Sequence, residues 1–146
     1  MKVFRQRVEF ETKGQIEFFD ITQQVQEVIE QSGVREGQVL VYSNHTTLGV
    51  AINQNEPMLI QDFMRILYKI APVDEHYSHD LFELRRETIS DGRSNGHSHC
   101  KAMILGVSEV IPIERGKMIL SPRQSVFGVE FDGGRKRDVI VQVTGL

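Results

Sequence analysis

Cysteine is almost absent from this sequence: Cys100 is the only one among 146 residues. A single cysteine excludes an intrachain disulfide. Nothing in the sequence points to export, so a reducing cytoplasm is the expected compartment. The chain also lacks any apolar run close to the ~18 residues of a membrane span. Its N-terminus alternates apolar and charged residues, as a strand does and a signal peptide does not. We therefore expect no membrane partner.

An excess of positive charge is also missing. Lysine and arginine total 17 against 20 aspartates and glutamates, which gives a formal net charge of -3 and a pI near 5.9. This balance argues against a nucleic-acid partner, because nucleic-acid-binding proteins normally carry a broad basic face. There is no internal repeat, low-complexity tract or linker. The length suits one domain with one core, which we assign to residues 1–146.

The apolar residues recur with both strand and helix periods. Helices are predicted over Ile21–Ser32, with Asp20 as N-cap and Gly33 as C-cap, and from about Pro57 to Ala71. The predicted strands are Val3–Thr12, Ile16–Phe19, Gln38–Ser43, Leu48–Asn53, Val107–Ile113, Lys117–Leu120, Gln124–Phe131 and Arg135–Val143. The last three strands are close in sequence and predict an antiparallel meander. Because βαβ alternation is missing, we predict an α+β fold, a mixed and mainly antiparallel sheet packed against two or three helices.

A third, short apolar helix is predicted over Cys100–Leu105, closed by Gly106. A loop rich in glycine, asparagine and serine, Asp91–Gly96, leads toward it. The free N–H groups at such a helix start are a ready anion site. His97 and His99 lie between the loop and the predicted helix, and Lys101 lies in its first turn. These side chains add groups that bind a metal, move a proton or neutralise a phosphate. The alternative is that Ser98 caps the helix and that His97 and Lys101 are surface residues. The crowding of histidines in this segment favours the interpretation as a functional site.

Three other segments hold candidate functional residues. His45-Thr46-Thr47, with Asn53 and Asn55 at the end of the next strand, would floor a pocket; by itself this segment is more typical of a turn, with Asn55 capping the following helix. Asp74–Asp80 contains His76 and His79, but its spacing matches no zinc signature, and alone it is typical of a solvated loop. It lies in Val73–Arg93, a stretch to which we assign no element.

The last segment is the basic turn Gly133–Arg137, which we consider together with Arg123 and Gln124. It would grip a phosphate through its cationic side chains, or be an ordinary charged hairpin tip. The segments described so far give three histidine clusters, each in a loop beside the end of a predicted element. In a domain of this size they predict one shared metal or phosphate site.

Ordered motifs spread along the whole chain resemble the YjbQ-like family, also called UPF0047. The motifs are His45-Thr46-Thr47-x-x-x-x-Ile52-Asn53-x-Asn55-Glu56-Pro57, His79-Asp80, Asn95–Gly106, and Gln124-x-x-x-Gly128-x-Glu130–Gly133 with Arg135–Arg137. This chain departs from the family's pattern at two positions, and both departures bear on the identity of the substrate. The family often has tryptophan just before the position of Gln124, where this chain has Arg123. Many members have Asn-Glu-Asn where this chain has Asn53-Gln54-Asn55.

The resemblance implies a small cytoplasmic α+β protein that forms a homotrimer. It also implies a pocket at the motif histidines. Our hypothesis is that His45, His79 and His99 surround a divalent metal, zinc or magnesium, or the anion that the metal accompanies. We expect Asp80 and Glu56 to orient a ligand or take a proton, and Lys101 to balance phosphate charge. The expected substrate-binding residues are Thr46, Thr47, Asn53, Asn55, Asn95, His97 and Gln124.

Some members of the family have a secondary thiamine-phosphate synthase activity, which joins a pyrimidine pyrophosphate to a thiazole phosphate. Such chemistry needs cationic or N–H donors around the phosphates. Dedicated synthases are TIM barrels of ~250 residues, so this activity is expected to be weak or incidental here. The alternatives are a hydrolase or transferase acting on another phosphorylated metabolite, and a non-catalytic protein that binds a metabolite or anion.

Overall fold

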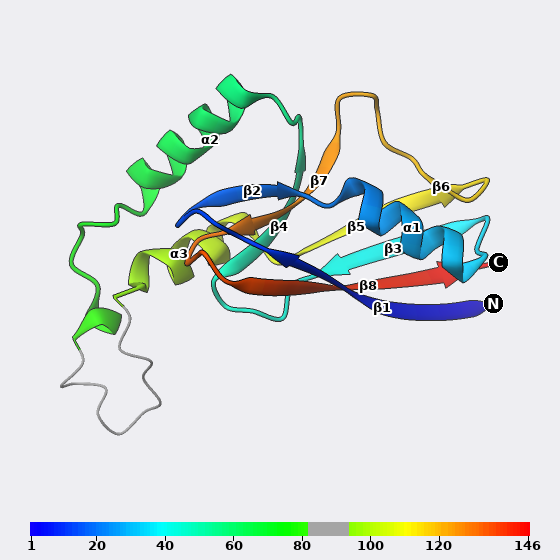
Figure 1. The fold of residues 1–146 in the computed structure, drawn as a ribbon, viewed down its shortest axis with the longest axis horizontal. Coiled ribbons are helices and arrows are strands. Elements are labelled where there is room, and N and C mark those ends of the chain that lie inside the picture. The colour runs from blue at the N-terminus through cyan, green and yellow to red at the C-terminus, as the bar shows by residue number, and fades with distance from the viewer. Residues whose placement is uncertain (82–93) are drawn as a thin grey trace.

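The computed structural model describes residues 1–81 and 94–146, and confirms the predicted α+β fold (Figure 1). The strands are β1 (Lys2–Glu11), β2 (Glu17–Asp20), β3 (Gly37–Tyr42), β4 (Leu48–Asn53), β5 (Ser108–Glu114), β6 (Lys117–Met118), β7 (Ser125–Glu130) and β8 (Lys136–Gly145). The helices are α1 (Thr22–Ser32), α2 (Pro57–Ile70) and α3 (Gly96–Leu105), with the short 3₁₀ helix η1 (Ser78–Asp80). Each predicted strand is present, with ends that differ by at most two residues.

The strands form two antiparallel sheets, one in the order β1-β8-β3-β5-β6 and one in the order β2-β7-β4. The predicted meander of the last three strands is therefore wrong. β6 pairs with β5, β7 lies in the centre of the smaller sheet, and β8 lies between β1 and β3. β7 is buried along almost its whole length, which suits a central strand with neighbours on both sides.

The main core lies between the five-stranded sheet on one side and α1 with the three-stranded sheet on the other. Its buried residues are Val8, Phe10, Ile21, Val25, Val28, Ile29, Val34, Val39, Val41, Leu48, Val50, Ile111, Ile113, Val126, Val139, Val141 and Val143. Strand alternation produces this arrangement, because every second residue of β8 faces inward. The same alternation leaves the opposite face of the three-stranded sheet to a second core.

The second core lies where α2 and α3 cover the three-stranded sheet. It contains Leu67, Ala102, Phe127, Val129 and Phe131. Small residues on β4 let α3 approach closely: a Cβ atom at Gly49 would lie 2.9 Å from the carbonyl oxygen of Gly106 and from the Leu105 side chain. Gly49 of β4 therefore serves the close packing of α3.

The helix ends follow local polar chemistry, with two corrections. Gly33 has a φ of 71° and ends α1, as predicted. The N-cap of α1 is Ile21 rather than Asp20, although the Asp20 carboxylate accepts a hydrogen bond from the N–H of Thr22 at 2.9 Å. Glu56, not Asn55, caps α2, because its side chain accepts from the first turn. Asn55 instead donates to Asp20 at 3.0 Å.

Helix α3 begins at Gly96 rather than at Cys100, and Ser98 does not cap it. The Ser98 hydroxyl donates to the carbonyl oxygen of Phe131, which ties the helix to the end of β7. The N–H of Gly96 donates to Asp80 Oδ1 at 3.0 Å. One of the backbone N–H groups of the predicted anion site is therefore already bound to a carboxylate of the protein. The unassigned stretch Val73–Arg93 contains η1, and its part from 82 to 93 lies outside the described residues.

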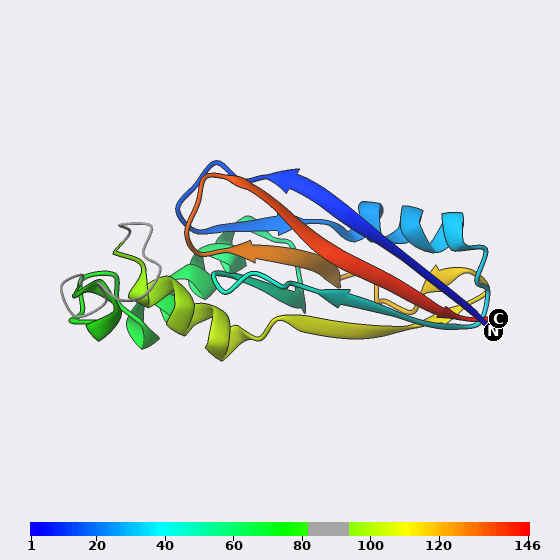
Figure 2. The same cartoon turned by 90° about the horizontal axis from the view of Figure 1, so that it is seen from below.

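The helices α2, η1 and α3 gather at one end of the elongated molecule, and both termini lie at the other end (Figures 1 and 2). The β3–β4 loop and the β7–β8 turn reach toward the helical end, because both follow strands that run in that direction. Loop residues from both sheets therefore meet α3. Within the part of the chain that the structure describes, no helix is long and apolar enough to cross a membrane.

Candidate functional site

A pocket of about 410 Å³ opens at the meeting point of the β3–β4 loop, η1, the start of α3 and the β7–β8 turn. Its lining residues are Asn44, His45, Thr46, Thr47, His79, Asn95, His99, Asp132, Arg135 and Arg137. Three segments that are far apart in sequence thus contribute imidazoles to one cavity. The lining is mostly polar and charged, which is typical of a site for a small polar or ionic ligand.

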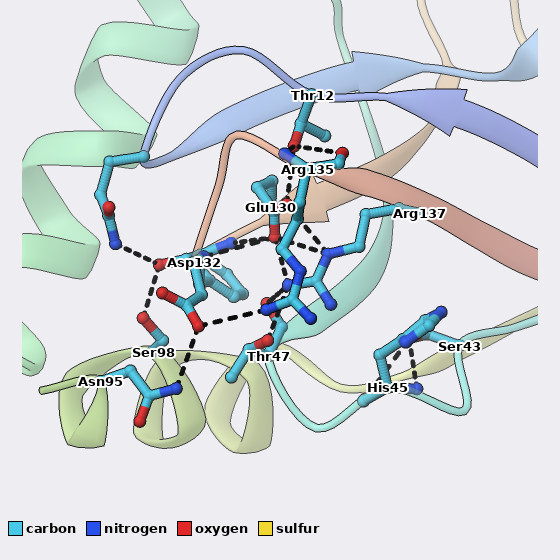
Figure 3. Close-up of polar contacts among 12 residues, drawn as sticks. Thr12, Ser43, His45, Thr47, Asn95, Ser98, Glu130, Asp132, Arg135 and Arg137 are labelled. Atoms are coloured by element: carbon cyan, nitrogen blue, oxygen red, sulfur yellow. Dashed lines mark hydrogen bonds and ion pairs between the residues drawn. The ribbon is translucent and has the colours of Figure 1, made fainter. Parts of the chain in front are cut away.

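A hydrogen-bonded chain fixes His79 from behind. Asn95 is 4% exposed and donates from its amide nitrogen to Asp132 Oδ2 at 3.0 Å (Figure 3). Its Oδ1 lies 3.0 Å from Nε2 of His79. Because the amide nitrogen of Asn95 is used by Asp132, the oxygen accepts, and Nε2 of His79 carries the hydrogen. In the neutral ring, the lone pair of His79 is therefore on Nδ1.

The rings of His79 and His99 are in contact at an edge. Their centroids are 4.6 Å apart and their planes are inclined by 70°. His79 comes from η1 and His99 from the first turn of α3, so the contact also joins these two elements. Gly96 makes this approach possible, since a Cβ atom there would lie 2.5 Å from Cβ of Tyr77.

A buried ion pair forms the opposite wall. The Arg137 guanidinium binds Glu130 through Nε at 2.9 and 3.0 Å and through Nη2 at 2.6 Å, with side chains only 2% and 0% exposed. Glu130 also accepts from the Thr12 hydroxyl at 2.7 Å. Burial alone would raise the pKa of Glu130, but the hydrogen bonds from Arg137 and Thr12 outweigh it and hold the pKa below its usual range.

One nitrogen of the Arg137 guanidinium has no acceptor in the part of the chain that the structure describes. Nη2 also donates to Thr47 Oγ1 at 2.7 Å, whereas Nη1 has no hydrogen-bond partner among the described residues. A buried cationic donor without a partner is costly and therefore rare. Arg135 lies beside the same pocket, 39% exposed, with Nη1 3.5 Å from Asp132 Oδ2 (Figure 3). The pocket therefore has N–H donors available for an anion.

His45 is held from the far side of the pocket. It lies in the β3–β4 loop, and its Nε2 is 2.8 Å from Oδ1 of Asp138 on β8. The other oxygen of Asp138 pairs with Arg7 of β1 at 3.1 Å. Burial alone would raise the pKa of Asp138, but the hydrogen bond from His45 and the charge of Arg7 outweigh it, and the pKa lies below the usual value.

The three histidines share the pocket without forming a metal centre. Among residues 1–81 and 94–146, no group of three or more histidine, cysteine, aspartate or glutamate side chains is placed to hold a metal ion. His79 and His99 are in contact, but His45 is tied to Asp138 on the other side. The arrangement of these described residues therefore does not fit the three-histidine metal site expected from the sequence.

The structure brings together six of the residues proposed from the sequence: His45, Thr46, Thr47, His79, Asn95 and His99 line the one pocket. Other proposed residues have local structural partners outside it. Glu56 caps α2, Asp80 binds the start of α3, and Asn55 binds Asp20. Asn53 Oδ1 accepts from the N–H of Gln54, and Gln124 Oε1 accepts from the N–H of Ser121 in an exposed turn.

Lys101 and His97 also lie outside the pocket lining, and both are buried. Lys101 is 0% exposed and donates through Nζ to the carbonyl oxygen of Ala71 at 2.6 Å and to Nδ1 of His97 at 2.8 Å. Burial lowers the pKa of Lys101 and that of His97. These contacts tie α3 to the end of α2. Neither the expected phosphate-balancing role of Lys101 nor the alternative of a surface position matches its place in the structure. Cys100, which precedes Lys101 in α3, is only partly buried.

Sequence reasoning missed two lining residues, Asn44 and Asp132. Asp132 stands next to the basic turn that was considered, but nothing in the sequence distinguishes it from other turn aspartates. Arg135 and Arg137 were recognised only as parts of that turn. A signal for Arg137 was available: on β8 it shares the inward-facing positions with Val139, Val141 and Val143. A buried arginine needs a carboxylate partner, which directs attention to Glu130.

Comparison with known proteins places this chain among a set of similar sequences. The family model described as UPF0047 protein YjbQ-like matches residues 6–146. A protein of Methanothermobacter thermautotrophicus described as a UPF0047 protein is 37% identical over 145 residues, which covers 99% of this chain and 94% of that relative.

Solved structures show the same fold. A protein of Sulfolobus solfataricus, described as a YbjQ-like protein of unknown function, superposes with a TM-score of 0.89 at 29% identity and covers 99% of both chains. A YjbQ/UPF0047 family protein of Clostridium acetobutylicum gives a TM-score of 0.84 at 34% identity and covers 95% of this chain and 99% of its own.

Proposed function

Because this chain belongs to the YjbQ-like UPF0047 family, a family of unknown function, we propose a function from the pocket itself: it binds the phosphate group of a small phosphorylated metabolite and acts on that metabolite as a transferase or hydrolase. One observation carries the proposal. Nη1 of Arg137 belongs to a buried guanidinium beside the pocket, is fixed by an ion pair, and has no acceptor among residues 1–81 and 94–146. A phosphate oxygen would supply that acceptor with a charge-assisted hydrogen bond.

The neighbouring side chains support an anion of phosphate size. The Arg135 side chain is 39% exposed, and its one polar contact with the described residues is the long one to Asp132, so it is able to turn toward a ligand. The hydroxyls of Thr46 and Thr47 add polar groups, and the imidazoles of His79 and His99 are suited to proton transfer. A volume of about 410 Å³ accommodates a phosphorylated molecule of metabolite size.

Inorganic phosphate and pyrophosphate test the binding half of the proposal. Calorimetric titration should detect both anions, and Arg135→Gln should weaken phosphate binding about tenfold, as expected for the loss of one charge-assisted hydrogen bond. Arg123→Gln is the matched control, because it removes the same charge from an exposed turn outside the pocket. Equal affinities of the two variants, or no binding by the unmodified protein, would overturn the proposal.

Product analysis tests the catalytic half. The protein is incubated with a pyrimidine pyrophosphate and a thiazole phosphate, the pair implied by the family resemblance, and separately with a panel of phosphomonoesters. Formation of thiamine phosphate with release of pyrophosphate supports a synthase, and release of inorganic phosphate supports a hydrolase. Binding of phosphate without turnover of any substrate in the panel supports the third alternative, a metabolite-binding protein.

The homotrimer implied by the resemblance is part of this proposal. Support comes from apolar side chains that are exposed on α2, namely Met58, Ile66, Tyr68 and Ile70. Exposed apolar groups in one region commonly mark an interface with another chain. Light scattering during size-exclusion chromatography tests it, and a monomer at micromolar concentration counts against it.

A further inference from the structure

The carboxylate of Asp138 joins two side chains that come from different strands and loops. Its Oδ1 lies 2.8 Å from Nε2 of His45, and its Oδ2 lies 3.1 Å from Nη1 of Arg7. Both oxygens of the carboxylate are therefore engaged, one by an imidazole at the pocket and one by a cation on β1. This geometry restricts rotation of the carboxylate and, through it, the orientation of the His45 ring.

The hydrogen bond to Asp138 also determines which nitrogen of His45 carries the proton. An ionised carboxylate only accepts, so Nε2 of His45 is the donor and the lone pair of the neutral ring is on Nδ1. Nδ1 has no hydrogen-bond partner among the described residues, and the side chain is 31% exposed at the pocket. The free Nδ1 lone pair is the group that a proton acceptor requires.

We propose that Asp138, itself held by Arg7, is a positioning residue that makes Nδ1 of His45 the proton acceptor of the phosphate pocket. This inference rests on the proposed function and narrows it to nucleophiles that carry an O–H group. The O–H bond of water or an alcohol breaks, its proton passes to Nδ1, and its oxygen forms the new bond to phosphorus. The ester oxygen of the substrate leaves with the electron pair of the bond that breaks. A nitrogen nucleophile without a proton would not need this base.

Bromoacetate tests the assignment without a known substrate. Its carboxylate is a small anion for the arginine side chains. The Nδ1 lone pair attacks its methylene carbon, the carbon–bromine bond breaks, and bromide leaves. Peptide mapping by mass spectrometry locates the modified histidines, and chromatography against standards distinguishes the Nδ1 from the Nε2 isomer. We expect His45 of the unmodified protein to be carboxymethylated at Nδ1, and phosphate to slow the reaction.

Three variants separate the positioning role from loss of charge. Asp138→Ala should slow alkylation at Nδ1 of His45 about tenfold, the size typical for loss of a carboxylate that orients a histidine, and should yield both isomers. Asp138→Asn should restore the Nδ1 isomer, because its amide oxygen still accepts from Nε2. Glu9→Ala is the matched control: Glu9 is the cross-strand partner of Asp138 and lines a surface pocket together with Asp138 and His45, but within the described part of the chain it makes no hydrogen bond to His45.

The inference is overturned if Asp138→Ala reacts at Nδ1 alone at the unmodified rate, if Glu9→Ala has the same effect as Asp138→Ala, or if His45 of the unmodified protein is inert or reacts at Nε2. Phosphate titration of the same proteins keeps the two proposals distinguishable. Absence of phosphate binding contradicts the proposed function, whereas the isomer produced at His45 decides the role of Asp138 in either case.

Discussion

Replacement of Arg137 by methionine is the most informative perturbation of this fold, because it leaves the Glu130 carboxylate buried without its cation. Glu130 is 0% exposed and, of its donors among the described residues, would keep the Thr12 hydroxyl and two backbone N–H groups. Removal of one partner of a buried ion pair costs about 3–5 kcal/mol. For a chain of this size, that corresponds to a fall in Tm of roughly 6–20 °C.

Urea denaturation and thermal melting measure this cost, and two further variants show whether the ion pair causes it. Arg65→Met removes an arginine that pairs with Asp62 on the exposed surface of α2, and should cost less than about 1 kcal/mol. In the double variant Glu130→Gln/Arg137→Met, no buried charge is left behind, so stability on the order of 2 kcal/mol should return relative to Arg137→Met. Equal costs for Arg137→Met and Arg65→Met, or strict additivity in the double variant, would refute the reasoning.

Two other predictions concern α3 and its neighbours. Because burial lowers the pKa of Lys101, the folded state loses this proton at a lower pH than the unfolded chain. The free energy of unfolding of the unmodified protein, relative to that of Lys101→Met, should therefore rise between pH 7 and pH 10 in urea titrations. A difference that stays constant with pH would contradict this prediction. Gly96→Ala places a Cβ atom 2.5 Å from Cβ of Tyr77. It should cost about 1–3 kcal/mol and weaken phosphate binding by displacing His79, whereas unchanged melting and binding would show that η1 adapts freely.

The elements were predictable from the sequence, but the pairing of the strands was not. Alternation in Leu48–Asn53 and helical spacing in Ile21–Ser32 are local signals, and Gly33 marks the end of α1 for a conformational reason. The partners of β7 depend on which of the two sheets contains it. A strand that is buried on both faces has the same sequence pattern in either sheet. Proximity along the chain favoured a meander that the packing of two sheets overrides.

The site was partly predictable, because its histidines lie in loops at the ends of clear elements. His45, His79 and His99 meet at one pocket, as their positions beside predicted strand and helix ends indicated. Lys101 was misjudged for a physical reason: one lysine within an apolar helix has the same sequence pattern whether it faces a ligand or a buried carbonyl oxygen. Only the position of Ala71 at the end of α2 decides between these cases, and that is a tertiary contact.

The two arginines of the pocket differ in how much their side-chain contacts must change when a ligand binds. Arg137 is fixed by Glu130 and Thr47, so its free Nη1 is already ordered and an anion would bind it without further loss of side-chain freedom. Arg135 is more exposed and must exchange its contact with Asp132 for a contact with the ligand. A ligand therefore gains directional binding from the buried guanidinium and adaptability from the exposed one. Arg137 is buried on β8 and therefore needs the Glu130 carboxylate as its partner, whereas the Arg135 side chain is partly exposed and its charge is also in contact with water.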